Sequence, residues 1–264
     1  FLSYAPRMPK EFLSIYKRRR QHAFDDIPQE LAQHYPKYYQ RTFHWQTDGW
    51  LSKRSAELYD PGVEFLFGGT AAIMRRMLLP EILDTLAKET EPTLLDVACG
   101  TGRFIKQVSQ LRPQVTITGV DLSPFYVDYA ATHCRSPNVR CTTANAESLP
   151  FPDNSFSVVT CIYLFHELPK DVRRQVMSEL VRVAKPGGLI AVLDSEQLKT
   201  GADIGSFLTQ FPKVYHEPYY LSYLRDDLGA VMRDAGLLDI NHHGHFVSRS
   251  FFGRKPSGTG GDSV

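Results

Sequence analysis

Cysteine is scarce in this 264-residue chain, and its spacing matches no metal-binding or redox motif. Cys99, Cys134, Cys141 and Cys161 form no Cys-x-x-Cys pair, and no histidine stands beside them at a ligand spacing. We therefore expect neither a zinc site nor a disulfide framework, and we predict no metal ion. Unpaired thiols favour a reducing compartment, so we predict a cytoplasmic protein.

Long apolar runs and an excess of one charge are also missing. No apolar stretch reaches membrane-spanning length, and no signal peptide is visible. The chain starts at Phe1 rather than Met, which indicates a trimmed N-terminus and leaves an organellar targeting segment open. The formal net charge is +1, so no strong field attracts nucleic acid or an anionic membrane. We expect no nucleic-acid partner, and the sequence does not indicate an oligomeric state.

A hydrophobic content of 42% is sufficient for one good core, and the composition divides the chain into regions. Residues 1–60 are rich in aromatic side chains, and we predict a helical extension that lies over the main domain as a lid. Its basic run, residues 17–20, is either a solvated helix face or a contact for an anionic partner. Residues 61–255 are the predicted main domain, with an aromatic-rich cap inserted at 196–222. The Gly- and Ser-rich tail, 256–264, is expected to be disordered.

Apolar runs and helical patterns alternate through the main domain. Helical periodicity over 63–88 is broken by Gly68-Gly69 and by Pro80, which predicts two helices there. The predicted strands are 93–98, 115–120, 139–142, 156–162 and 189–194, followed by an antiparallel pair at 237–241 and 245–252. This alternation predicts an α/β fold with a doubly wound, Rossmann-like sheet of seven strands whose last strand is antiparallel.

The segment Leu94–Phe104 joins a buried strand to a helix through Asp96 and a Gly-Thr-Gly turn. Such a corner brings the free N–H groups of a helix start close to a ligand. A dinucleotide fingerprint would need Gly or Ala at the position of Ile105, and Asp96 would repel a pyrophosphate. Asp121 stands 19 residues beyond Gly102, at the end of the second predicted strand. An acid there is placed to bind the two hydroxyls of a ribose.

These residues resemble motifs of the class I S-adenosylmethionine (SAM) methyltransferases. The Asp96-to-Gly102 corner is similar to their motif I. The segment Asn145–Phe151 resembles their D-A-E-x-L-P-F segment, with Asn145 in place of Asp, and Arg182–Gly188 resembles R-V-L-K-P-G-G. The resemblance covers about residues 90–195 and is greatest to the branch that includes the ubiquinone and menaquinone methyltransferases.

The resemblance implies a SAM site, with S-adenosylhomocysteine (SAH) as the product. In that branch a Tyr-Asp pair helps to close over the cofactor, and Tyr59-Asp60 is its counterpart here. The implied cofactor contacts are Tyr59, Asp96, Ala98, Cys99, Gly100, Thr101, Gly102, Asp121, Leu122, Asn145, Ala146, Glu147, Cys161, Ile162 and His166.

His166 is the candidate catalytic residue, because relatives carry histidine here beside the SAM methyl group and its ordinary pKa is near working pH. It could equally cap the following helix or pack beneath the cofactor, since many methyl transfers need only alignment. Glu167 is a weaker candidate base, and Tyr163 is interpreted as core. Asp194 and Glu196 are interpreted as a strand end that faces solvent rather than as metal ligands.

We predict an enzyme that transfers a methyl group from SAM to a small, apolar or aromatic acceptor. Asn/Asp-Pro-Pro-Tyr and Pro-Cys signatures of base methylation are absent from the sequence. Two alternatives stay open. One is a methyltransferase of RNA or protein that uses the basic run, and the other is a SAM-binding regulator without an acceptor pocket.

Overall fold

The structure is a computed structural model that describes residues 8–21, 27, 29–46 and 48–257. Most of the predicted disordered tail, 258–264, lies outside these residues. The helices, with short 3-10 helices labelled η, are α1 (Met8–Gln21), α2 (Gln29–Ala32), η1 (Phe43–Trp45), α3 (Lys53–Leu66), α4 (Ala71–Arg76), α5 (Leu79–Ala87), α6 (Arg103–Leu111), α7 (Pro124–His133), η2 (Phe165–Glu167), α8 (Lys170–Val183), η3 (Ala202–Ile204), α9 (Gly205–Val214), α10 (Tyr220–Leu224) and α11 (Leu228–Asp234). The strands are β1 (Thr93–Val97), β2 (Thr116–Asp121), β3 (Val139–Thr143), β4 (Phe156–Ile162), β5 (Ala184–Ser195), β6 (Leu238–His245) and β7 (Ser248–Arg254).

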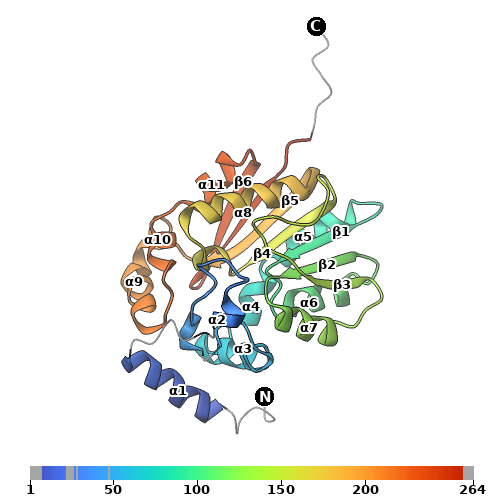
Figure 1. Ribbon diagram of the computed structural model, residues 1–264. Helices are drawn as coiled ribbons and strands as arrows, with labels where there is room; N and C mark the ends of the chain where they lie inside the picture. The colour runs from blue at the N-terminus through green and yellow to red at the C-terminus, as the bar shows by residue number, and fades with distance from the viewer. Residues whose placement is uncertain (1–7, 22–26, 28, 47, 258–264) are drawn as a thin grey trace.

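The strands form one seven-stranded sheet in the order β3-β2-β1-β4-β5-β7-β6 (Figure 1). The first five strands are parallel, and β7 runs antiparallel to both of its neighbours, β5 and β6. The predicted fold class is therefore confirmed. The strand order reverses between β1 and β4, and in open α/β sheets ligands bind at this point, beyond the carboxyl ends of the strands.

The two faces of the sheet bury separate cores, because successive strand residues point to opposite sides. Leu94 of β1 packs with residues of α5 and α6, including Ile82 and Ile105. Leu95, the next residue, packs with residues of α8 and α11, including Val176 and Met232. Helices cover both faces of the central strands, so most residues of β1, β4 and β5 are buried and most are apolar. This is why these strands stand out in the sequence as short apolar runs.

In the helical region before β1, the predicted boundaries differ from the structure. Pro80 does not end a helix; it lies in the first turn of α5, where its missing N–H has no helical partner in any case. The break at Gly68 and Gly69 is real, and α3 begins ten residues earlier than expected, capped by Ser52, whose Oγ accepts from the Ser55 N–H at 3.0 Å. The proposed domain boundary between residues 60 and 61 therefore lies inside a helix.

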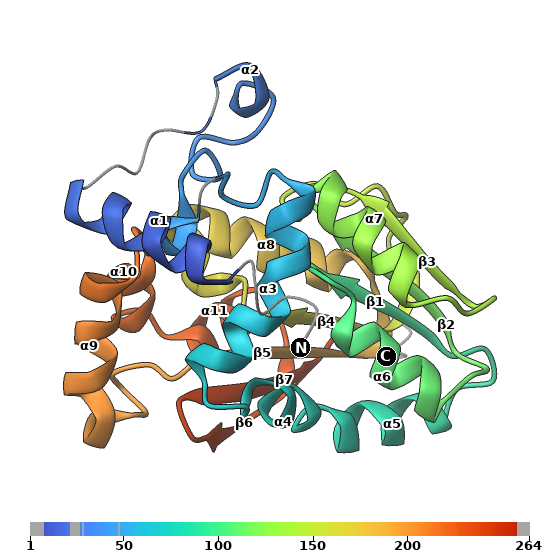
Figure 2. The ribbon, with the colours of Figure 1, turned by 90° about the horizontal axis from the view of Figure 1, so that it is seen from below.

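The aromatic-rich segments of the chain lie on one side of the molecule, beyond the carboxyl ends of the strands. Figure 1 and Figure 2 both show α1, α9 and α10 on the same side of the molecule, with α3 next to α7. The segment predicted as a cap, 196–222, forms η3, α9 and the start of α10. Among the described residues, no helix combines the length and the apolar character that a bilayer crossing requires.

Candidate functional site

The Gly-Thr-Gly turn between β1 and α6 requires glycine at its last position. Gly102 has a φ of 76°, in the left-handed region. A Cβ built on it would lie 2.6 Å from Cys134 Sγ and 3.0 Å from Ala130 Cβ, both of which belong to the α7 region. Ile105, which excluded a dinucleotide motif in the sequence, has its space from another glycine, because a Cβ on Gly119 would lie 2.4 Å from its Cδ1. The glycine turn is thus packed tightly against the α7 region, and α6 is packed tightly against β2.

Asp121 closes the opposite side of this turn. The Gly100 N–H donates to its Oδ2 and the Ser123 N–H to its Oδ1, both at 2.9 Å. Burial raises the pKa of Asp121 to about 6, against the opposing effect of these backbone hydrogen bonds. A carboxylate fixed in this way at the end of β2 can accept hydrogen bonds from paired hydroxyls.

Asp60 of α3 holds the glycine turn through two side-chain hydrogen bonds. Thr101 Oγ1 donates to Asp60 Oδ1 at 2.9 Å, and Arg103 Nε donates to Asp60 Oδ2 at 2.7 Å. Asp60 is buried, and the preceding residue, Tyr59, contacts Trp50 and Tyr126 edge-on. The Tyr-Asp pair predicted from the resemblance therefore lies directly against the glycine turn.

A cavity of about 110 Å³ lies at this corner. Two of its residues have left-handed backbone although neither is glycine: Ala98 (φ 57°) follows β1 and Tyr163 (φ 57°) follows β4. Such conformations are costly and concentrate at ligand sites. We call it the smaller cavity, and its lining is Tyr38, Tyr39, Phe43, Trp50, Tyr59, Val97, Ala98, Gly100, Asp121, Leu122, Tyr126, Ala144, Asn145, Ala146, Ile162, Tyr163, Leu164, Glu167 and Leu168.

Some predicted cofactor contacts do not reach this lining. Asp96 is buried and accepts from Thr160 Oγ1 at 2.6 Å, and burial raises its pKa to about 7. The side-chain oxygen of Asn145 accepts from the Glu147 N–H at 3.0 Å, and Tyr38 donates to Glu147 Oε1 at 2.7 Å. Asp96, Cys99, Thr101, Gly102, Glu147 and Cys161 thus shape the corner or its surroundings without lining the cavity. His166, the remaining predicted contact outside the lining, does not reach this cavity either.

A second cavity, of about 520 Å³, adjoins the first, and we call it the larger cavity. The two share Tyr59, Tyr163 and Glu167 in their linings. The larger cavity is lined mainly by apolar and aromatic side chains of the N-terminal segment and of the 196–222 segment. These include Ile15, Tyr16, Leu58, Val63, Phe65, Leu66, Phe67, Phe207, Leu208, Phe211, Val214, Tyr215 and Tyr220.

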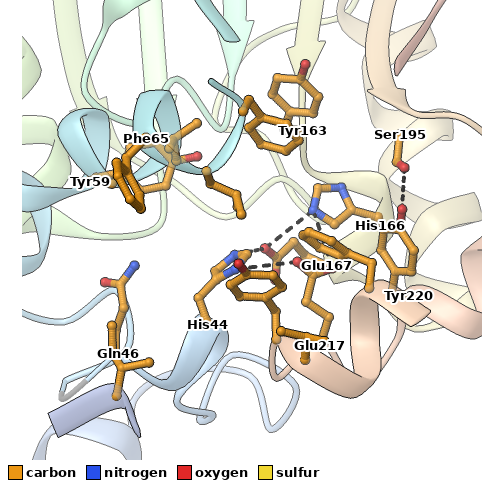
Figure 3. A pocket seen from close by; sticks show the side chains of 18 of the residues that line it. His44, Gln46, Tyr59, Phe65, Tyr163, His166, Glu167, Ser195, Glu217 and Tyr220 are labelled. Carbon is orange, nitrogen blue, oxygen red and sulfur yellow. Dashed lines mark hydrogen bonds and ion pairs between the residues drawn. The ribbon is translucent and has the colours of Figure 1, made fainter. Parts of the chain in front are cut away.

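The polar part of the larger cavity is a group of histidines and acids (Figure 3). His166 is buried, and its Nδ1 lies 2.7 Å from Asp194 Oδ1. Desolvation would lower the pKa of His166, but the carboxylates of Asp194, Glu217 and Glu167 outweigh it and raise that pKa to about 10. His44 lies opposite, with Nε2 3.2 Å from Glu167 Oε1.

These positions correct several sequence interpretations. Asp194 and Glu196 do not face solvent, since both are buried and Asp194 contacts His166. His166 does not cap α8, whose N-cap is Pro169 with no side-chain cap hydrogen bond. Tyr163 is half-buried; it packs against the core, as interpreted, and also lines both cavities.

Glu217 and His44 were not identified from the sequence. Both stand in segments whose only signal was a concentration of aromatic residues, and no motif points to either. In the fold, His44 from η1 and Glu217 from the α9–α10 connection meet His166 and Glu167, which follow β4. His44 lies more than 100 residues before Glu167 and Glu217, and Glu217 lies 51 residues after His166, so no short spacing along the chain indicates these contacts.

Comparison with known proteins gives the context for this site. Residues 94–188 match the family model described as a methyltransferase domain. Over 121 residues the chain is 34% identical to a demethylmenaquinone methyltransferase of Listeria monocytogenes serotype 4a (strain HCC23), a match that covers 44% of this chain and 50% of the relative. The chain thus spans about half the length of the curated relatives it matches first.

Two further matches cover more of the chain. An O-methyltransferase of Aspergillus nomiae NRRL is 29% identical over 171 residues, which is 63% of this chain and 73% of that protein. A solved structure from Thermotoga maritima, a possible histamine N-methyltransferase, has a TM-score of 0.56 at 18% identity and covers 77% of this chain and 97% of its own. The structural likeness shows the fold, and together these matches confirm the resemblance drawn from the sequence motifs.

Proposed function

We propose that this chain, which carries a methyltransferase domain of the class I type, transfers a methyl group from SAM to a small, apolar or aromatic acceptor. One observation carries the proposal. The smaller cavity, at the glycine turn, adjoins a larger and mostly apolar cavity, and the two share Tyr59, Tyr163 and Glu167 in their linings. A cofactor in the first cavity and an acceptor in the second would meet at this shared wall.

The residues of the smaller cavity fit SAM. Asp121 offers an acceptor for ribose hydroxyls, and Gly100 leaves the main chain open to close approach. The rings of Trp50, Tyr59 and Tyr126 surround the cavity with centroids 5.6 to 5.9 Å apart, which suits an adenine or a sulfonium group. Glu167, an acid at the shared wall, suits the positive charge of a sulfonium.

The lining of the larger cavity supports a small acceptor. Aromatic side chains from α3 and α9, such as Phe65 and Phe211, face a space that a ring or a short apolar chain can fill. Residues from α1, α3 and α9 all contribute, which supports the predicted lid role of the extension and of the 196–222 segment. Covering segments of this kind exclude water from the reacting atoms.

The chemistry of transfer belongs to SAM, whose sulfonium methyl passes to a nucleophilic atom while the C–S bonding pair stays on sulfur as SAH forms. The chain's residues bind and align the two partners, which by itself supplies much of the rate. An acceptor O–H, N–H or acidic C–H also releases a proton. His166 presents Nε2 to the larger cavity because Nδ1 is bound to Asp194, so our prediction that His166 takes this proton assigns it to Nε2. A pKa of about 10 keeps the imidazole protonated near neutral pH, so this base role requires the neutral form that prevails only at alkaline pH.

The two alternatives differ from this proposal in what they require. A SAM-binding regulator needs no acceptor pocket, and the 520 Å³ cavity favours an enzyme over it. A methyltransferase of RNA or protein would use the basic run in α1. Arg19 of that run lines the larger cavity, which favours a contact to a small anionic or polar group at its mouth over an extended basic surface.

The proposal is tested with isotopically labelled SAM and a panel of phenols, quinols, amines and carbon acids. We expect label transfer to a ring-bearing or apolar compound, with SAH released in equal amount. Label transfer to RNA or to protein, weakened steeply by salt, would support the macromolecular alternative. SAH binding without transfer to any compound would support the regulator.

A further inference from the structure

Four side chains at the wall of the larger cavity form a closed ring in which imidazole and carboxylate alternate (Figure 3). His44 Nε2 lies 3.2 Å from Glu167 Oε1, and Glu167 Oε1 lies 3.6 Å from His166 Nε2. His166 Nε2 lies 3.9 Å from Glu217 Oε2, and Glu217 Oε1 lies 3.4 Å from His44 Nδ1. The ring draws on η1, η2 and the α9–α10 connection, so it exists only in the folded chain.

These separations are those of atoms that share one metal ion. Ligand atoms bound about 2.1 Å from a tetrahedral ion lie roughly 3.4 Å from one another. One set of donor atoms, His44 Nε2, Glu167 Oε1, His166 Nε2 and Glu217 Oε2, has successive separations of 3.2, 3.6 and 3.9 Å, on either side of this value. Ligand atoms of His44, Glu167 and Glu217 all lie within 4.8 Å of one another. His44 faces the two carboxylates with different ring nitrogens, so one of the two would ligate.

The carboxylate of Glu217 has no cation that donates a hydrogen bond to it. Glu217 is only 5% exposed, yet neither of its oxygens has a hydrogen-bond donor, and Glu167 Oε2 also has none. Burying a carboxylate without hydrogen bonds is costly unless a cation compensates it. The charges that act most on Glu217 are His166, His44, Glu167 and Asp194, a set without Lys or Arg. His44 Nδ1 and His166 Nε2 lie 3.4 and 3.9 Å from the Glu217 oxygens, close enough for an ion pair but without the geometry of a hydrogen bond.

Asp194 holds His166 through Nδ1, the ring nitrogen that does not face the other three side chains. It is fully buried, and its Oδ1 lies 2.7 Å from His166 Nδ1. Its position is fixed, because the Phe165 N–H donates to Oδ2 at 2.8 Å and the Ser195 N–H to Oδ1 at 2.7 Å. A carboxylate that holds one nitrogen of a histidine leaves the other directed at a metal, as in carboxylate–histidine–zinc arrangements.

We propose that His44, His166, Glu167 and Glu217 bind one divalent transition-metal ion, such as Zn²⁺ or Mn²⁺, at the wall of the larger cavity, where Glu167 also lines the smaller one. Two imidazoles favour these ions over Mg²⁺ and Ca²⁺, which prefer oxygen ligands alone. The site contradicts the absence of metal that cysteine and histidine spacing predicted. If the proposed function holds, Nε2 of His166 is a metal ligand in the loaded protein and not the base. The ion would then orient an acceptor through a hydroxyl or carbonyl oxygen, bound as a fifth ligand, and lower the pKa of a bound hydroxyl.

The test is metal binding by the full chain, independent of turnover. Protein stripped with a chelator is titrated with Zn²⁺ by calorimetry and with Co²⁺ by visible absorption, which reports the coordination of the bound ion. We expect one ion per chain. His44→Ala and Glu217→Gln should each weaken binding at least ~100-fold, and Asp194→Asn should weaken it roughly 10- to 100-fold. His133→Ala, which removes an exposed histidine at the end of α7, should bind like the wild type.

Two results would overturn the metal site. One is wild-type protein that binds neither ion more tightly than the Glu217→Gln variant. The other is a bound ion whose affinity is unchanged in both His44→Ala and Glu217→Gln, since that ion would lie elsewhere. SAH binding measured on the same samples separates the two proposals. Intact SAH binding without metal binding refutes the metal site alone, and metal binding without SAH binding refutes the cofactor assignment alone. Circular dichroism of each variant shows that it is folded.

Discussion

The two adjoining cavities differ in how the chain builds them. The smaller one rests on a continuous corner of the sheet, where β1, β2 and β4 end within residues 97–163. The larger one is assembled from segments at both ends of the chain, from Ile15 in α1 to Ser248 in β7. The sheet side of the smaller cavity is therefore local, although Tyr38, Tyr39, Phe43, Trp50 and Tyr59 of the N-terminal segment also line it. The larger cavity, which would select the acceptor, depends almost entirely on distant segments coming together.

This difference indicates which residues determine cofactor binding and which determine the choice of acceptor. Backbone geometry fixes the smaller cavity through the φ of Gly102, the left-handed Ala98 and the hydrogen bonds from Gly100 and Ser123 to Asp121. Side chains fix the larger cavity, and few of them are constrained by the backbone. Changes in the smaller cavity should therefore affect folding or cofactor affinity, and changes in the larger one should affect acceptor use.

We expect the largest difference between the two cavities in the free energy of unfolding, when one methyl group is added to a glycine beside each of them. Gly102→Ala combines a left-handed φ with a contact of 2.6 Å to Cys134 Sγ, and it should destabilise the protein by roughly 2–4 kcal/mol. Gly62→Ala, in helix α3 beside the larger cavity, meets nothing within 4 Å and should be neutral or stabilising by about 0.5–1 kcal/mol. Urea unfolding of both variants measures the difference, and equal costs would contradict the comparison.

A pH titration should affect cofactor binding through Asp121. Its pKa of about 6 lies above the ordinary value of 3.8, so its ionisation lowers the stability of the ligand-free protein as pH rises through that window. Ribose hydroxyls need the ionised form. SAH affinity should therefore fall about 10-fold from pH 8 to pH 5, because one unit below the pKa about a tenth of the carboxyl is ionised.

Asp121→Asn is the control for this titration. The variant should bind SAH weakly at every pH, with a flatter profile. Asp96, whose pKa is about 7, titrates in the same pH range. The Asp96→Asn variant should still lose SAH affinity between pH 8 and pH 5, because Asp121 causes that loss. A wild-type affinity that stays constant from pH 8 to pH 5 would exclude Asp121 as the ribose ligand.

Tyr59, on the shared wall, should affect both cavities. Tyr59→Ala removes ring contacts to Trp50 and Tyr126, and aromatic pairs are worth about 0.5–1.5 kcal/mol each. SAH affinity should fall about 5-fold, and the KM of the acceptor identified with labelled SAM should rise by a similar factor. Tyr59→Phe keeps the ring and should keep both values. A change confined to one ligand would place Tyr59 in only one site.

The smallest effect is expected from removing α1. Ile15, Tyr16 and Arg19 line the larger cavity and not the smaller one, so deleting residues 1–21 should raise the acceptor KM about 3-fold. SAH affinity should stay within about 2-fold of the wild type. Deleting residues 1–55 is a poorer test, because it also removes Trp50 and Phe43 from the smaller cavity. A loss of SAH binding on deleting 1–21 would contradict the division of roles.

The sequence predicted the sheet and the smaller cavity better than the larger one, for a physical reason. Strands covered on both faces are continuously apolar, and the glycine turn and Asp121 stand where each strand ends, so spacing along the chain reports position in space. The ring of His44, His166, Glu167 and Glu217 has no such spacing, and Glu217 stands alone in an aromatic segment. Asp194 was misinterpreted because a strand-end acid commonly faces solvent, whereas here the 196–222 segment covers it.

The central claim, that cofactor and acceptor occupy different cavities, is tested most directly by calorimetric titration of SAH into two single variants. Asp121→Ala, in the smaller cavity, should weaken SAH binding roughly 10- to 100-fold, as expected for lost charge-assisted hydrogen bonds. Phe211→Ala, in the larger cavity, should leave SAH affinity within about 2-fold of the wild type. Unchanged binding in Asp121→Ala, or a loss of binding in Phe211→Ala of the same size, would contradict the account.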